Sequence, residues 1–102
     1  MRKALVLVNN KKAGILEELT HHAYRFNYFS DYHGAPVSLT MTISQLTYES
    51  DHFPSFFEGL LPEGTMLEAM LRQCKLDKND YFGQLLQIGK DVVGAVTVEE
   101  IK

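Results

Sequence analysis

The sequence has one cysteine, Cys74, and no tryptophan among its 102 residues. A single cysteine excludes an internal disulfide and is typical of a protein from a reducing compartment. Long apolar runs are also absent. The run over residues 4–8, which follows a basic start, is shorter than the ~7–15 residues in the core of a signal peptide. No stretch approaches the ~20 apolar residues of a membrane-spanning helix, so we expect a soluble, cytoplasmic protein.

The chain also lacks an excess of positive charge. It has 10 Lys and Arg residues against 13 Asp and Glu residues, which gives a net charge of -3 at pH 7. A protein that binds a phosphate backbone is usually basic, so direct contact with nucleic acid is not expected. Four histidines are present without the HExxH or zinc-finger spacing of a metal site: His21, His22, His33 and His52. We expect no metal ligand and no cofactor.

The motifs of common enzymes are missing as well. Neither GxxxxGK[ST] nor GxGxxG, the glycine-rich sequences that hold phosphates, occurs in the chain. Ser55 and Cys74 are nucleophiles in type, but no base and orienting group accompany them. Asp77 begins like a calcium loop, yet its sixth position is Phe82 and its twelfth is Ile88, where glycine and glutamate are needed. We therefore expect no enzymatic activity and assign no catalytic residue.

What the sequence does contain is typical of one globular domain over residues 1–102, with 45% hydrophobic and 23% charged residues. The first half shows the short apolar runs and the period-two alternation of β-strands. We predict strands at residues 4–8, 15–19, 22–29 and 37–42. Residues 9–12 are predicted to turn between the first two strands, because asparagine tolerates a positive φ.

The second half changes to the 3.6-residue period of helices. A short helix is predicted over residues 54–61, and a second starts at Thr65, whose spacing to Glu68 fits a capping box. Residues 77–80 offer N-caps for a third helix, which Gly89 ends. Residues 92–98 are predicted as the last strand, with Gly94 as a point of close approach. This order indicates an α+β fold: a small antiparallel or mixed sheet of about five strands with about three short helices.

Residues 53–64, FPSFFEGLLPEG, place many aromatic side chains on a very short helix. Their apolar residues share one helix face: Phe53, Phe56, Phe57, Leu60 and Leu61. Core packing is the ordinary interpretation of such a face, and it suits at least half of these residues. The other interpretation is that the face is presented to a partner. We expect two or three of the four from Phe56 to Leu61 to be buried and the rest to face outward.

The same stretch carries a resemblance to a known family. FFEGLLPEG, followed about twenty residues later by DYFGQLLQIGKDVVGAVTV, resembles the N-terminal subdomain of the HipA family of bacterial serine/threonine kinase toxins. The segment KALVLVNNKKAGILEEL and the aromatic strand before PVSLTM fit the same subdomain, so that the resemblance covers residues 3–98. In a full-length HipA-like protein the subdomain continues into the kinase core, which binds ATP and magnesium. The present sequence stops at Lys102, which implies a relative of the N-terminal module alone.

Separate chains of this kind occur in tripartite HipBST toxin–antitoxin systems. There the kinase toxin HipT lacks the subdomain and the small protein HipS, an antitoxin, supplies it; toxins of the family phosphorylate aminoacyl-tRNA synthetases. The resemblance to HipS implies an antitoxin that binds and inhibits a HipT-like kinase toxin. It leaves room for a HipB-like DNA-binding protein in a larger complex. A non-inhibitory structural subunit, which completes or stabilises the kinase, remains the alternative.

The resemblance directs attention to a partner-binding site at the aromatic helix and the turn after it. The expected site residues are Phe53, Phe56, Phe57, Pro62, Glu63, Gly64, Thr65 and Met66. Aromatic side chains dominate the energetics of interfaces, and a turn stiffened by proline loses little entropy on docking. We expect residues 62–66 to reach toward the kinase active-site region. Because the turn has no aromatic residue, Met66 is the best candidate for insertion into a cleft.

Overall fold

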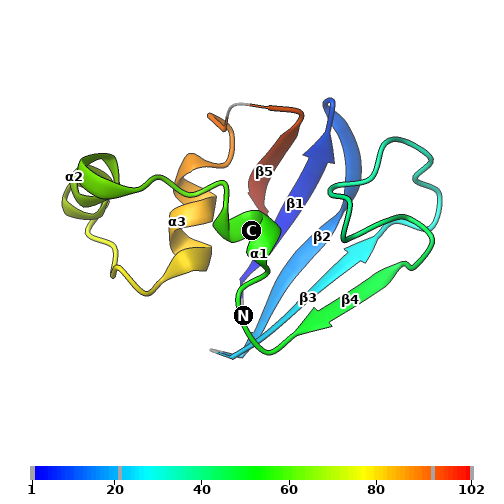
Figure 1. The fold of residues 1–102 in the computed structure, drawn as a ribbon, viewed down its shortest axis with the longest axis horizontal. Helices are drawn as coiled ribbons and strands as arrows, with labels where there is room; N and C mark the ends of the chain where they lie inside the picture. The colour runs from blue at the N-terminus through cyan, green and yellow to red at the C-terminus, as the bar shows by residue number, and fades with distance from the viewer. Residues whose placement is uncertain (1, 21, 93, 102) are drawn as a thin grey trace.

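The computed structural model describes residues 2–20, 22–92 and 94–101, and within them the expected α+β fold is confirmed. The elements are β1 (Lys3–Val8), β2 (Lys11–Thr20), β3 (Ala23–Tyr28), β4 (Thr47–Ser50), α1 (Ser55–Glu58), α2 (Gly64–Cys74), α3 (Tyr81–Ile88) and β5 (Val96–Ile101). All neighbouring strands are antiparallel, in the order β4-β3-β2-β1-β5. In Figure 1 the sheet lies on the right, α1 lies near the centre of the view with α3 to its left, and α2 lies at the far left.

The turn between β1 and β2 forms where the sequence predicts it. Asn9 and Asn10 have φ values of 51° and 65°, and Val8 pairs with Lys11 across the hairpin. Two central residues with positive φ give the strand twist that a two-residue hairpin needs. Asparagine adopts this conformation more readily than other residues with a Cβ, which explains the pair at this point.

The predicted strand at residues 37–42 is wrong. Only an isolated bridge joins Ser38 to Met41, and the segment forms part of the long connection between β3 and β4. Val37 and Met41 are buried, but Leu39, expected on the same side, is 93% exposed. A turn that buries both of its ends therefore imitates the alternation of a strand. The fourth strand of the sheet is β4, which the sequence analysis did not identify.

The last strand and its glycine also differ from the prediction. β5 begins at Val96 instead of residue 92, and nothing lies within 4 Å of a Cβ built on Gly94. The close approach occurs at Gly89, where a Cβ would lie 2.3 Å from the Val98 carbonyl oxygen. The Val98 N–H donates to the Gly89 carbonyl oxygen at 3.0 Å. Gly89 ends α3 as predicted, and its missing side chain lets the helix end pack directly on β5.

One of the two predicted helix caps is confirmed. Asp80 caps α3, and its carboxylate accepts a hydrogen bond from the Gly83 N–H at 3.1 Å. The capping box from Thr65 to Glu68 is wrong, because α2 starts one residue earlier, after Glu63, and no side chain caps it. α1 is shorter than the predicted helix and has Pro54 at its N-cap position.

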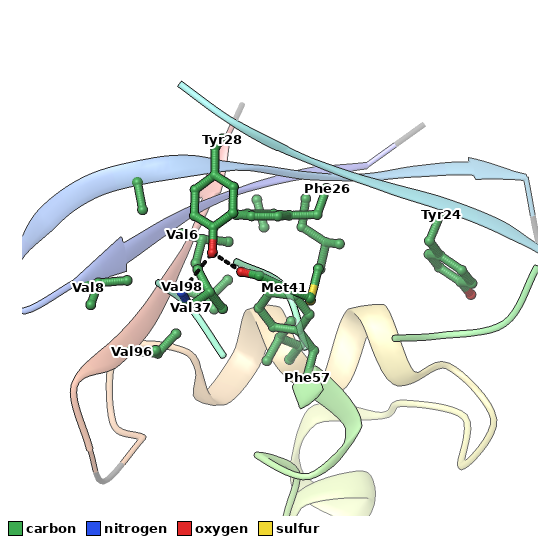
Figure 2. Close-up of a cluster of buried hydrophobic side chains, with 14 of the residues drawn as sticks. Val6, Val8, Tyr24, Phe26, Tyr28, Val37, Met41, Phe57, Val96 and Val98 are labelled. Atoms are coloured by element: carbon green, nitrogen blue, oxygen red, sulfur yellow. Dashed lines mark hydrogen bonds between the residues drawn. The ribbon is translucent and has the colours of Figure 1, made fainter. Parts of the chain in front are cut away.

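The core lies between one face of the sheet and the helices α1 and α3. Figure 2 shows the side chains of the strands pointing toward Phe57 of α1. The largest side chains with almost no exposure are Phe26, Phe57, Phe82, Leu16 and Leu85. The Phe26 and Phe57 rings lie 6.0 Å apart, so α1 contacts the centre of the sheet directly. Burial of this apolar surface is the main contribution to stability.

Candidate partner-binding site

The aromatic part of the expected site is mostly in the core of the chain. Phe57 is 0% exposed and Phe53 is 5% exposed, and the Phe53 ring packs edge-on against Tyr24 at 5.4 Å. Phe56, Leu60 and Leu61 are half-buried and pack against the core. The expectation for Phe56 to Leu61 was two or three buried residues, and one of the four is fully buried. Phe53 and Phe57 are therefore inaccessible in the described structure, and their contact with a partner stays a prediction.

The second part of the expected site surrounds the start of α2. Pro62 is half-buried, whereas Glu63, Gly64, Thr65 and Met66 are exposed. Glu63 is extended, and Gly64 has a φ of +60°, a left-handed conformation that favours glycine. The chain thus changes direction sharply at this glycine and enters the helix. Met66 lies in the first turn of α2 and is 73% exposed.

A groove lies beside Met66, between residues 59–62, which lead into α2, and the end of α3. It has a volume of about 490 Å³, and its apolar lining residues are Leu60, Pro62, Met66, Met70, Ile88 and Val92. Asp91 is at its margin as a charged side chain. Pro62 and Met66 were expected at the site from the sequence, whereas Met70, Ile88 and Val92 were not. The spacing of Met66 and Met70, four residues apart on one helix, is the signal that could have found Met70.

α2 itself presents an apolar side that the chain does not cover completely. Four apolar residues share one face of α2 and are half-buried: Leu67, Met70, Leu71 and Cys74. No residue of α2 is buried. Most surface helices of globular proteins bury one apolar stripe against a core. An amphipathic helix without a buried residue, next to an apolar groove, forms a surface that suits a protein partner.

A histidine near α1 has neighbours that resemble a catalytic relay in composition only. The His52 Nδ1 atom lies 3.3 Å from the Ser50 hydroxyl and 2.9 Å from the Asp51 carboxylate. A serine–histidine–aspartate relay needs its serine and its carboxylate on different ring nitrogens. The hydrogen bond from His52 lowers the pKa of Asp51, and all three residues lie near the surface. This cluster therefore has the geometry of a polar turn and not of a nucleophilic site.

Comparison with known proteins identifies the family. Residues 4–99 match the family described as the HipA N-terminal domain. The chain belongs to this family. A protein of Haemophilus influenzae (strain Rd), called an uncharacterized protein, is 33% identical over 102 residues, which are all of this chain and 95% of the relative. A solved structure named the N-terminal domain of HipA toxin is 28% identical and matches with a TM-score of 0.79, over 100% of this chain and 94% of that chain.

The chain is related to the N-terminal domain of HipA and not to its kinase domain. The match is to the N-terminal domain along almost the whole chain, so the chain is related to a component of a toxin system. Among residues 2–20, 22–92 and 94–101, no helix is long and apolar enough to cross a membrane. Over the same residues, no three His, Cys, Asp or Glu side chains gather in a way that could hold a metal ion.

Proposed function

We propose that this HipA N-terminal domain is a HipS-like antitoxin, which binds and inhibits a HipA-like kinase toxin that lacks the domain. The observation that carries the proposal is the exposed Met66 beside the apolar groove, at the start of a helix without a buried residue. A domain that is fused to a kinase in full-length HipA has one face adapted to that kinase. The groove and α2 are the apolar surface that such a face requires.

The related proteins support the domain's role as a separate partner. The Haemophilus influenzae relative is covered to 95% by this chain, so that relative consists almost entirely of the same domain. A HipA N-terminal domain in a separate polypeptide can reach a kinase only by association. Apolar contacts of the groove residues Leu60, Met70 and Ile88 supply most of the free energy of such association, so that binding does not depend on Met66 alone.

Inhibition is assigned to residues 62–66. The left-handed Gly64 and the ring of Pro62 fix the backbone that leads to Met66. A segment that is already ordered loses little conformational entropy when it enters a cleft. Met66 is unbranched and flexible, so it fits an irregular pocket. We assign to Met66 the role of occupying the active-site region of the kinase.

The alternative function is a structural subunit that completes the kinase without inhibiting it. The groove supports the alternative, because it can receive a side chain of the kinase while no residue of this chain enters the kinase. Phe53 and Phe57 are also in the core, so the aromatic helix supports the fold of the domain. Both functions require binding, and they differ in the effect of Met66 on kinase activity.

The test is the growth of bacteria that express the kinase toxin, with and without this chain. Wild-type chain is expected to restore growth, and Met66→Asp is expected to lose the rescue while still co-purifying with the kinase. Leu39→Asp is the matched control, since Leu39 is also highly exposed and lies outside the proposed site. Full rescue by Met66→Asp would assign inhibition to other residues. No rescue by the wild-type chain, despite co-purification, would favour the structural subunit.

A further inference from the structure

The position of α2 requires an explanation, because its apolar side is only half-buried. It has 11 residues and none of them is buried. In Figure 1 it lies at one end of the molecule, and α3 lies between it and the sheet. Helices of this length are only marginally stable without tertiary contacts. The direction of α2 is therefore set by the two segments that connect it to the rest of the chain.

The segment before α2 is held by the core. The Leu60 and Leu61 side chains pack against the core cluster. The Leu60 N–H donates to the Phe57 carbonyl at 3.1 Å, and the Leu61 N–H donates to the Glu58 carbonyl at 3.1 Å. These hydrogen bonds extend the helical turn of α1 to the residue before Pro62. The N-terminal end of α2 is thus attached to the buried Phe57.

The segment after α2 is held by a buried amide. Gln84 of α3 is 1% exposed, and it is the buried polar residue among the described residues. Its Nε2 atom donates to the carbonyl oxygens of Asp77 at 3.2 Å and Lys78 at 3.1 Å. One side-chain amide can donate two hydrogen bonds, and here both go to the connection between α2 and α3. The connection is therefore tied to the core by one side chain.

Arg2 contacts the end of the same connection, at Asp80. Its guanidinium donates to both carboxylate oxygens of Glu18 on β2, at 2.8 and 2.7 Å. It also donates to both oxygens of Asp80, the N-cap of α3, at 3.0 and 2.7 Å. The guanidinium carbon lies 5.3 Å from the centre of the Phe82 ring. Arg2 thereby joins β2 to the junction at which the connection becomes α3.

We propose that Gln84, supported by Arg2, is a positioning residue that fixes the direction in which α2 presents Met66 and the groove. This inference rests on the proposed function, since the partner in question is the HipA-like kinase. An apolar side chain at position 84 would pack in the core without the cost of burying an amide. A buried amide contributes modestly to net stability, but its directional bonds fix one geometry. The role of Gln84 therefore lies in the orientation of the binding surface.

The test compares Gln84→Met with Gln87→Met. Methionine has a similar length and flexibility and removes both donors at position 84, whereas Gln87 is exposed on the same helix. The orientation of α2 relative to the sheet is measured by residual dipolar couplings of the backbone amides in the free, full chain. In wild type and Gln87→Met, one alignment is expected to fit both α2 and the sheet. In Gln84→Met, the couplings of α2 are expected to shrink while those of β1 to β3 are retained.

Binding to the kinase provides the second measurement. Gln84→Met is expected to weaken the affinity about tenfold, because without its two hydrogen bonds α2 must be ordered during binding. Gln87→Met is expected to bind as wild type. Unchanged α2 couplings in Gln84→Met would overturn the positioning role, whatever the kinase does. Absence of kinase binding by wild-type chain would overturn the proposed function instead. If Gln84→Met does not fold, the α2 couplings are measured in Arg2→Met, which changes a half-exposed side chain. The same result, smaller or unchanged α2 couplings, then supports or overturns the positioning role.

Discussion

At the scale of single residues, three tyrosine hydroxyls hold the long connection between β3 and β4. The Tyr28 hydroxyl accepts a hydrogen bond from the Val37 N–H at 2.7 Å and donates one to the Met41 carbonyl oxygen (Figure 2). Tyr32 and Tyr48 donate to backbone carbonyls of the same connection, those of Ala35 and Thr42, at 2.5 and 2.6 Å. Buried backbone groups in an irregular segment need such partners. Tyr28 of β3 therefore supports both the core and the connection.

Tyr28→Phe is predicted to lower the free energy of unfolding by about 1–3 kcal/mol, because it leaves the Val37 N–H and the Met41 carbonyl without their partner. Burial raises the pKa of Tyr28 above its usual value near 10. The phenol therefore ionises at a lower pH in the unfolded chain than in the folded chain. Its contribution to the free energy of unfolding is complete below pH about 10 and is lost as the pH rises through the folded-state pKa. Denaturant unfolding between pH 8 and 11 should show a shallower alkaline loss of stability in Tyr28→Phe.

The control for this prediction is Tyr81→Phe, which removes a hydroxyl from a tyrosine that is 37% exposed. Its free energy of unfolding should change by less than about 0.5 kcal/mol, as is usual for surface positions. An alkaline slope in Tyr28→Phe equal to that of wild type would show that Tyr28 does not contribute to the pH dependence.

At the scale of elements, the sequence predicts what is periodic and misses what depends on distant partners. The alternation of Tyr24, Phe26 and Tyr28 predicts β3 correctly, since all three are buried on one face. β4 was missed because its four residues alternate only between exposed and half-buried positions. Its place in the sheet comes from pairing with β3, as in the opposition of Phe26 and Tyr48. Pairing between distant residues leaves little trace in a short strand of mixed composition.

The candidate site shows the same division. Pro62 and Met66 were expected at the site because proline and the neighbouring glycine mark a stiff turn, and both residues line the groove. Ile88 and Val92 were not found, since they join the groove only through the packing of α3 and the chain that follows it. Phe53 and Phe57 have a helical spacing that indicates an apolar face but cannot show which surface that face contacts. The fold decides this by placing Phe57 against Phe26.

The packing of α3 on β5 provides an element-scale prediction. Gly89→Ala is predicted to lower the free energy of unfolding by about 1–3 kcal/mol, because the added Cβ would overlap the Val98 carbonyl and force the helix end away. Gly59→Ala is the matched control: its Cβ would meet neighbours only at 3.4 Å or more, and its φ of -64° suits alanine. Denaturant unfolding of the two variants gives the comparison. Equal stability of Gly89→Ala and Gly59→Ala would contradict the close contact.

At the scale of the whole molecule, the elements that enclose the core can be distinguished from α2, which has no buried residue. The sheet, α1 and α3 enclose the aromatic core, whereas α2 lies at one end of the long axis of 39 Å (Figure 1). Met66 and the groove are found where α2 approaches α1 and α3. A core that is packed without α2 allows changes on α2 to affect binding with little effect on folding. The domain is in this respect suited to be a partner of a larger protein.

The most direct test of the account is a titration of the purified HipA-like kinase with this chain, with phosphorylation of its substrate as the readout. We predict that kinase activity falls to a low plateau when the chain reaches an equimolar amount. Met66→Asp should bind in the same titration but leave most of the activity. Kinase activity that stays constant or rises while the wild-type chain is bound would contradict the antitoxin function and establish a structural subunit in its place.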